Sequence, residues 1–98
     1  MAKKVDANQP AIVAALREIP GVSVQDLHEV GRGCPDILVG YRGFTWRGSY
    51  VNSNWVFEIK VPGGKLNDRE REWHVTWRGP VAVIMSAEDA LRVMGVIE

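Results

Sequence analysis

The sequence contains little cysteine and no long apolar run, and each absence excludes a class of protein. Cys34 is the only cysteine among 98 residues, so an internal disulfide and a Cys₂His₂ zinc site are both excluded. A lone thiol also fits a reducing, intracellular compartment. No apolar run approaches the ~18 to 20 residues needed to cross a bilayer, so no membrane partner is expected.

The chain also lacks a net charge, with 12 basic and 12 acidic residues. This balance argues weakly against a nucleic-acid partner, because domains that bind nucleic acids usually carry a basic surface. The charges are unevenly placed, however. Residues 31–80 hold eight basic and five acidic side chains, and the remainder of the chain holds four and seven. The middle of the chain is therefore its basic part, which keeps a nucleic-acid partner open.

The pattern of apolar and turn-forming residues predicts one domain, residues 1–98, without repeats or linkers. The predicted order of elements is α-β-β-β-α-β-α, an α/β domain with a mixed central sheet flanked by helices. The predicted helices begin after Asn8, after Asn67 or Asp68, and after Ser86. The predicted strands are 22–27, 35–40, 54–60 and 81–85, and the last is expected to be buried.

Two of the predicted strands carry polar residues that indicate a function. Asp36 follows Pro35 at the start of one strand, and Glu58-Ile59-Lys60 ends the next. Side chains alternate between the two faces of a strand, so Glu58 and Lys60 share a face. A hairpin between the strands would place Asp36 near Glu58. Two carboxylates beside an ammonium group form a hard oxygen site for Mg²⁺ or Mn²⁺, of the kind that hydrolyses phosphodiesters.

Taken alone, each of these two motifs more often has a structural role than a catalytic one. An aspartate after proline is a common turn-to-strand junction, and a glutamate two residues before a lysine is often a solvated pair. The combination favours function, because a buried pair of carboxylates needs a matching charge, which a metal beside Lys60 would supply. Cys34 with His28 or His74 is a weaker candidate for a nucleophilic pair. A packed thiol is the commoner role for a cysteine before proline.

The motifs and their order resemble a known family. Gly33-Cys34-Pro35-Asp36 and Glu58-Ile59-Lys60 are followed by Gly64-Lys65-Leu66-Asn67 and by a helix with Glu70 and Trp73-His74. This series resembles the PD-(D/E)xK nucleases, in particular the virus-type replication-repair nuclease (VRR-NUC) branch, over nearly the whole chain. The resemblance implies a restriction-endonuclease-like fold with an α-β-β-β-α-β core. It also implies DNA cleavage that depends on Mg²⁺ or Mn²⁺, in a process such as DNA repair.

The resemblance implies roles for the residues of the central motif. Asp36, Glu58 and the carbonyl group of Ile59 would bind the metal, and Lys60 would be the catalytic lysine.

Two further positions depart from the family pattern. The first helix of the family usually presents a glutamate where this chain has Gln9, and the later helix usually carries a glutamine where this chain has Glu70. We take both as candidate site residues, with the hypothesis that Glu70 restores the negative charge lost at Gln9. The alternative makes Glu70 a surface charge within the charged segment 68–72.

Several side chains near the motif are candidate contacts with DNA. Those that would bind phosphates are Arg32, Lys65, Arg69 and Arg71, with a solvated surface as the alternative. Trp73 and Trp77 lie one helical turn apart and are expected to pack on the sheet or at a subunit contact.

Isolated domains of the VRR-NUC branch resemble Holliday-junction resolvases. The expected substrate is therefore a four-way DNA junction, recognised by shape and cut by a C₂ homodimer in the cytoplasm of a bacterial or phage-infected cell. Three alternatives stay open. The chain could be a nuclease of the same fold that acts on flaps, nicks or single strands. It could also be a non-catalytic DNA-binding or assembly module, or a small regulatory protein with a protein partner.

Overall fold

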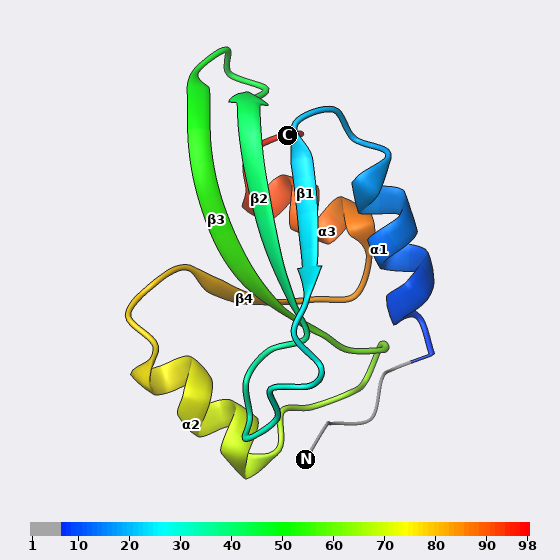
Figure 1. Cartoon of the computed structure of the whole chain (residues 1–98), viewed down its shortest axis with the longest axis vertical. Helices are drawn as coiled ribbons and strands as arrows, with labels where there is room; N and C mark the ends of the chain where they lie inside the picture. Colours follow the sequence, from blue (N-terminus) through cyan, green and yellow to red (C-terminus); the bar gives the residue numbers. More distant parts are fainter. Residues whose placement is uncertain (1–6) are drawn as a thin grey trace.

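A four-stranded sheet with three helices organises the fold, which the computed structural model describes for residues 7–98. The elements are α1 (Gln9–Arg17), β1 (Val22–Asp26), β2 (Ile37–Phe44), β3 (Tyr50–Ile59), α2 (Asp68–Thr76), β4 (Val81–Ile84) and α3 (Ala87–Val93), as Figure 1 shows. The predicted order α-β-β-β-α-β-α is confirmed. Within this described part of the chain, no helix is both long enough and apolar enough to span a membrane.

The sheet is mixed, with the spatial order β1-β2-β3-β4. The first three strands form an antiparallel meander, and β4 lies parallel to β3 after the crossover through α2. The β2–β3 hairpin is longer than predicted, because pairing continues to Phe44 opposite Tyr50. A tight turn closes it, in which the Thr45 amide donates to the Ser49 carbonyl at 2.7 Å.

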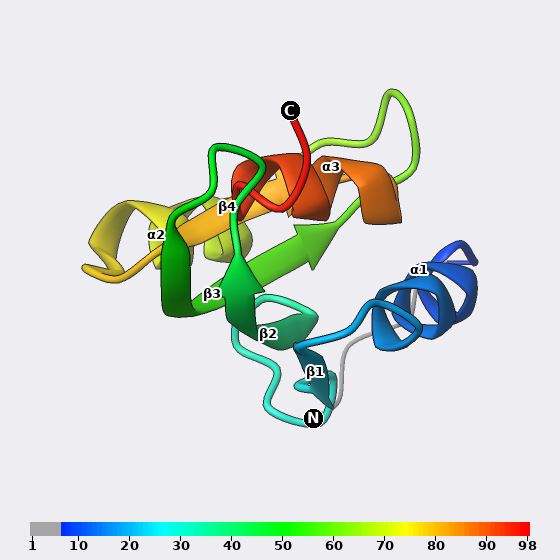
Figure 2. The ribbon, with the colours of Figure 1, turned by 90° about the horizontal axis from the view of Figure 1, so that it is seen from above.

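The hydrophobic core lies between one face of the sheet and the helices α1 and α3. Ile37 on β2 and Phe57 on β3 are paired across the two strands, and both are fully buried. They pack with Leu16 of α1 and Leu91 of α3 in a single cluster. Figure 2 shows α1 and α3 on one side of the sheet and α2 away from both. The opposite face at the end of β3 is thus left for α2 and for polar groups.

Two local predictions were wrong in detail. Strand β4 was expected to be buried, but it is an edge strand, and Val83 is 40% exposed. Asn8 precedes α1 as predicted, yet its side chain makes no capping hydrogen bond. Its Nδ2 instead donates to the carbonyl oxygens of Lys60 (3.3 Å) and Met85 (3.5 Å). The side chain therefore attaches the start of α1 to the ends of β3 and β4 rather than satisfying its own helix.

Candidate functional site

Asp36 lies just before β2, against the end of β3. Its amide donates to the Phe57 carbonyl at 3.0 Å, and its Oδ2 accepts from the Ile59 amide at 2.6 Å. Because Ile37 pairs with Phe57, the antiparallel register places Asp36 opposite Glu58, on the same face of the sheet. The exposed fractions of Asp36 and Glu58 are 1% and 0%. The hairpin thus brings two buried carboxylates to one end of the sheet.

Lys60 joins this pair from the same face. Its Nζ lies 3.7 Å from Glu58 Oε2 and 2.9 Å from Glu70 Oε1, and its side chain is only 16% exposed. The prediction that Glu58 and Lys60 share a face is confirmed. Glu70 is 3% exposed, so the alternative that made it a surface charge is wrong. The buried ion pair between Lys60 and Glu70 connects the end of β3 to helix α2.

Glu70 also caps helix α2. The Asn67 Oδ1 accepts from the Glu70 amide at 2.9 Å, and Glu70 Oε1 accepts from the Asn67 amide at 2.9 Å, which is a reciprocal capping box. One carboxylate oxygen therefore serves both the helix start and the ammonium group of Lys60. The spacing of Asn67 and Glu70 is a sequence signature of this cap, and it would have predicted that Glu70 turns toward the helix start.

Gln9, in the first turn of α1, is 3% exposed. Its Oε1 is buried and has no hydrogen-bond partner among residues 7–98. A buried carbonyl oxygen left in this state costs about 1–3 kcal/mol, so such an atom indicates a place where a ligand or water belongs. The contact of the adjacent Asn8 with the Lys60 carbonyl places this turn at the same end of the sheet.

The available donors fit one hard divalent cation. Within residues 7–98, no group of three or more His, Cys, Asp or Glu side chains gathers as a metal site. A cation would therefore need a mixed set of oxygen donors: Asp36, Glu58, the Ile59 carbonyl and Gln9 Oε1. Mg²⁺ commonly takes one or two protein carboxylates and keeps several waters. Two carboxylates with neutral oxygens suit Mg²⁺ or Mn²⁺, and they do not suit zinc, which prefers nitrogen and sulfur.

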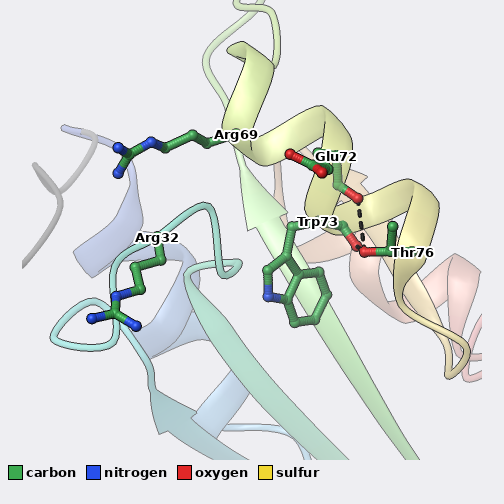
Figure 3. A pocket seen from close by; sticks show the side chains of 5 residues that line it. All are labelled: Arg32, Arg69, Glu72, Trp73 and Thr76. Carbon is green, nitrogen blue, oxygen red and sulfur yellow. Dashed lines mark hydrogen bonds between the residues drawn. The ribbon is translucent and has the colours of Figure 1, made fainter.

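The four candidate phosphate contacts differ in their surroundings. Arg71 forms an ion pair with Asp68 at 2.9 Å and donates to a backbone carbonyl, and Lys65 is an exposed residue of the loop before α2. Arg32 and Arg69 are both exposed and line one pocket, which Figure 3 shows. The structure thus brings two of the four basic residues together.

The pocket also contains Trp73, which was expected to pack on the sheet or at a subunit contact. Its ring stacks on Trp77, with centroids 4.6 Å apart and an interplanar angle of 19°. Trp77 is 48% exposed, so the pair leaves aromatic surface accessible beside α2. Only a tertiary contact between the turn around Arg32 and α2 makes this pocket, so no local sequence signal indicates it.

A second, exposed group of charges lies just after β1. His28 Nδ1 is 2.7 Å from Asp26 Oδ1, and His28 Nε2 is 3.0 Å from Glu29. The hydrogen bond to Asp26 raises the pKa of His28 above its ordinary value, although desolvation opposes the shift. Desolvation pushes the pKa of Asp26 upward, but the hydrogen bonds from His28 outweigh it and leave that pKa lowered.

No family model matches the chain, and the comparisons with curated proteins and with solved structures found no match either.

Proposed function

We propose that the protein is a metal-dependent DNA endonuclease of the VRR-NUC branch of the PD-(D/E)xK nucleases. The observation that carries the proposal is the burial of Asp36 and Glu58 on one face, with Lys60 3.7 Å from Glu58. Burying ionised groups costs several kcal/mol each unless partners match them, so such a cluster is rarely kept without a function. The fold agrees with the order of elements that the resemblance implies.

The residues of the cluster have distinct roles in this proposal. Asp36, Glu58, the Ile59 carbonyl and Gln9 would hold Mg²⁺ or Mn²⁺. When bound, that ion neutralises charge on a phosphoryl oxygen and makes a bound water more acidic. Lys60 contributes an ammonium group at the edge of the cluster, where it orients the attacking water and stabilises negative charge on the phosphate.

Glu70 acts on Lys60. Its 2.9 Å ion pair fixes the direction of the lysine side chain, and the capping box fixes Glu70 itself. Glu70 is therefore a positioning residue. The exchange of residue types at Gln9 and Glu70 leaves a neutral oxygen on α1 and puts the negative charge beside the lysine.

The proposed substrate is branched DNA, with the four-way junction as the form that the resemblance favours. Cleavage of a symmetric junction needs two cuts, so the proposed assembly is a C₂ homodimer with one site per subunit. Recognition would rely on backbone charge and on DNA shape.

A labelled four-way junction incubated with the pure protein and Mn²⁺ tests the proposal. We expect cleavage by the wild type and its loss in Asp36→Ala, since this change removes a proposed metal ligand. Asp68→Ala is the matched control, because Asp68 is an exposed carboxylate on α2 that pairs only with Arg71 among the described residues. An intact junction with the wild type contradicts the proposal. Binding of the junction without cleavage would favour the non-catalytic module instead.

A further inference from the structure

A pocket lies beside α2. Its volume is about 440 Å³, within the ~300–1,000 Å³ typical of small-ligand sites. The residues that line it are Arg32, Arg69, Glu72, Trp73 and Thr76. In Figure 3 the indole of Trp73 reaches from α2 toward the strands, and the side chains of Arg32 and Arg69 extend from the turn and from the start of the helix. The pocket thus combines cationic groups with an aromatic ring.

The two arginines are available for a ligand. The side chains of Arg32 and Arg69 make no hydrogen bond or ion pair with residues 7–98. Other arginines on helices are engaged: Arg71 pairs with Asp68 at 2.9 Å, and Arg92 pairs with Glu88 at 3.4 Å. Two guanidinium groups against one lining carboxylate leave a net positive charge that suits a phosphate.

The backbone holds the two walls of the pocket in fixed relation. Gly31, Arg32 and Gly33 have φ angles of 67°, 57° and 83°, so Arg32 is a non-glycine residue in the left-handed region. A Cβ atom at Gly33 would lie 2.4 Å from the Arg69 carbonyl oxygen, so the turn packs directly on the first turn of α2. Arg32 and Arg69 are therefore held as a pair by main-chain contact.

Trp73 gives the pocket a surface for a base. Its stack on Trp77, at 4.6 Å, holds the ring in one orientation. Every nucleobase has a face that can stack on an aromatic ring. In a duplex, however, both faces of a base are covered by its neighbours. A ring in a concave site therefore selects a base that has left the helical stack.

The pocket is also next to the buried cluster. Gly33 is separated from Asp36 only by Cys34 and Pro35, and Arg69 precedes Glu70, whose carboxylate binds Lys60. Both walls of the pocket therefore continue into the residues that are proposed to cut the phosphodiester.

We infer that this pocket binds an unpaired nucleotide next to the scissile bond, with its base on Trp73 and its phosphate between Arg32 and Arg69. The inference rests on the proposed nuclease function. It narrows the substrate class to DNA with an unpaired strand at the cut, such as a flap, a fork or an opened branch point. The charge of the phosphate gives affinity, and the stack gives the preference over duplex DNA.

DNA binding measured without metal tests the pocket independently of catalysis, which requires the metal in the proposed function. Fluorescence anisotropy in EDTA would compare a labelled thymidine oligonucleotide, a duplex of the same length and a forked DNA. We expect the wild type to prefer the single strand and the fork. Trp73→Ala should weaken single-strand binding about 5- to 150-fold, the equivalent of one base stack, and Trp73→Phe should restore part of it. Trp73→Phe also keeps the test valid if the alanine variant does not fold.

The arginine variants test the phosphate contact. Arg69→Ala should lower the slope of log affinity against log salt by about 0.7, the value of one phosphate on a single strand. Arg32→Asn should do the same, and asparagine tolerates the left-handed backbone of this turn. Arg92→Ala is the control, since it removes an arginine of α3 that is already paired.

Equal affinity for single strand and duplex, or Trp73 and Arg69 variants that bind like Arg92→Ala, would overturn the inference. The two proposals fail separately. If the pocket variants bind weakly but the wild type never cleaves DNA, the nuclease proposal fails and the pocket stands. If the wild type cleaves DNA, and the pocket variants bind and cleave it equally well, the inference about the pocket fails and the nuclease proposal stands.

Discussion

The two ends of the β2–β3 hairpin differ in opposite ways from the usual pattern, in which apolar side chains are buried and charged ones are exposed. At the open end, the carboxylates of Asp36 and Glu58 are almost completely buried. At the turn, the aromatic side chains of Phe44 and Tyr50 are 63% and 61% exposed. They contact each other edge to face, with centroids 5.1 Å apart. The open end of the hairpin therefore buries two carboxylates, and its turn exposes two aromatic rings.

This difference supports the place that we propose for the function. An exposed ring on a surface costs little, and a cross-strand aromatic pair is itself stabilising by about 0.2–1 kcal/mol. A buried carboxylate, by contrast, costs several kcal/mol without matching partners. At the charged end, the Ile59 amide binds Asp36 and Lys60 lies beside Glu58, and these contacts offset part of that cost. The proposed function adds a reason for keeping the carboxylates there.

The largest expected effect is on the rate of DNA cleavage. It should follow the removal of a cationic side chain from the charged end of the hairpin, but not the removal of one from the turn. Lys60→Ala should reduce the rate of DNA cleavage by about 10²–10³-fold, the usual value of one electrostatic contact to the transition state. Arg47→Ala, which removes a guanidinium that lies over Trp46 at the turn, should leave the rate unchanged. Single-turnover assays with Mn²⁺ measure both. Equal losses in the two variants would break the distinction between the ends.

A smaller effect is expected on stability at the charged end. Glu70→Ala removes both the cap of α2 and the partner of Lys60, so the free energy of unfolding should fall by about 2–3 kcal/mol. Glu70→Gln retains the capping box and should lose about 1 kcal/mol. Urea unfolding measures both, and Glu72→Ala, an exposed position on the same helix, should stay within about 0.5 kcal/mol of wild type. Identical losses for the alanine and glutamine variants would contradict the double role of Glu70.

The smallest expected effect is on the pH dependence of stability, and it comes from the exposed pair His28–Asp26. The raised pKa of His28 means that its contribution to stability is complete below the ordinary histidine pKa and is lost as the pH rises through the raised value. The lowered pKa of Asp26 gives a contribution that is present above the ordinary aspartate pKa and is lost as the pH falls through the lowered value.

An NMR titration of His28 checks this pair. In Asp26→Asn the pKa of His28 should fall toward its ordinary value, because the hydrogen bond to a carboxylate is the main cause of the shift. An unchanged pKa of His28 in that variant would show that another group raises it.

Local patterns predicted the hairpin and the charged cluster because both depend on short-range rules. The two-residue period of a strand placed Glu58 and Lys60 on one face, and antiparallel pairing placed Asp36 at the end of β3. The capping box with Asn67 fixes the position of Glu70, and the spacing of these two residues is its local sequence signal.

The remaining features depend on tertiary structure. Strand β4 has an apolar sequence like that of a buried strand, yet the strand order places it at the edge of the sheet. No local signal gives that order. The pocket around Trp73 arises because the turn before Asp36 packs on α2, and these segments are far apart in the sequence. Asn8 likewise does not cap α1 with its side chain, which instead donates to the Lys60 carbonyl at the end of β3.

The most direct test of the account asks which end of the hairpin binds a divalent cation. Mn²⁺ is paramagnetic, so substoichiometric amounts added to ¹⁵N-labelled protein broaden the amide signals of nearby residues. We predict broadening at Gln9, Asp36 and the segment 58–60, sharp signals at the turn 44–50, and loss of the effect in Asp36→Ala. Uniform broadening at both ends, or broadening that survives Asp36→Ala, would contradict a metal site at the buried carboxylates.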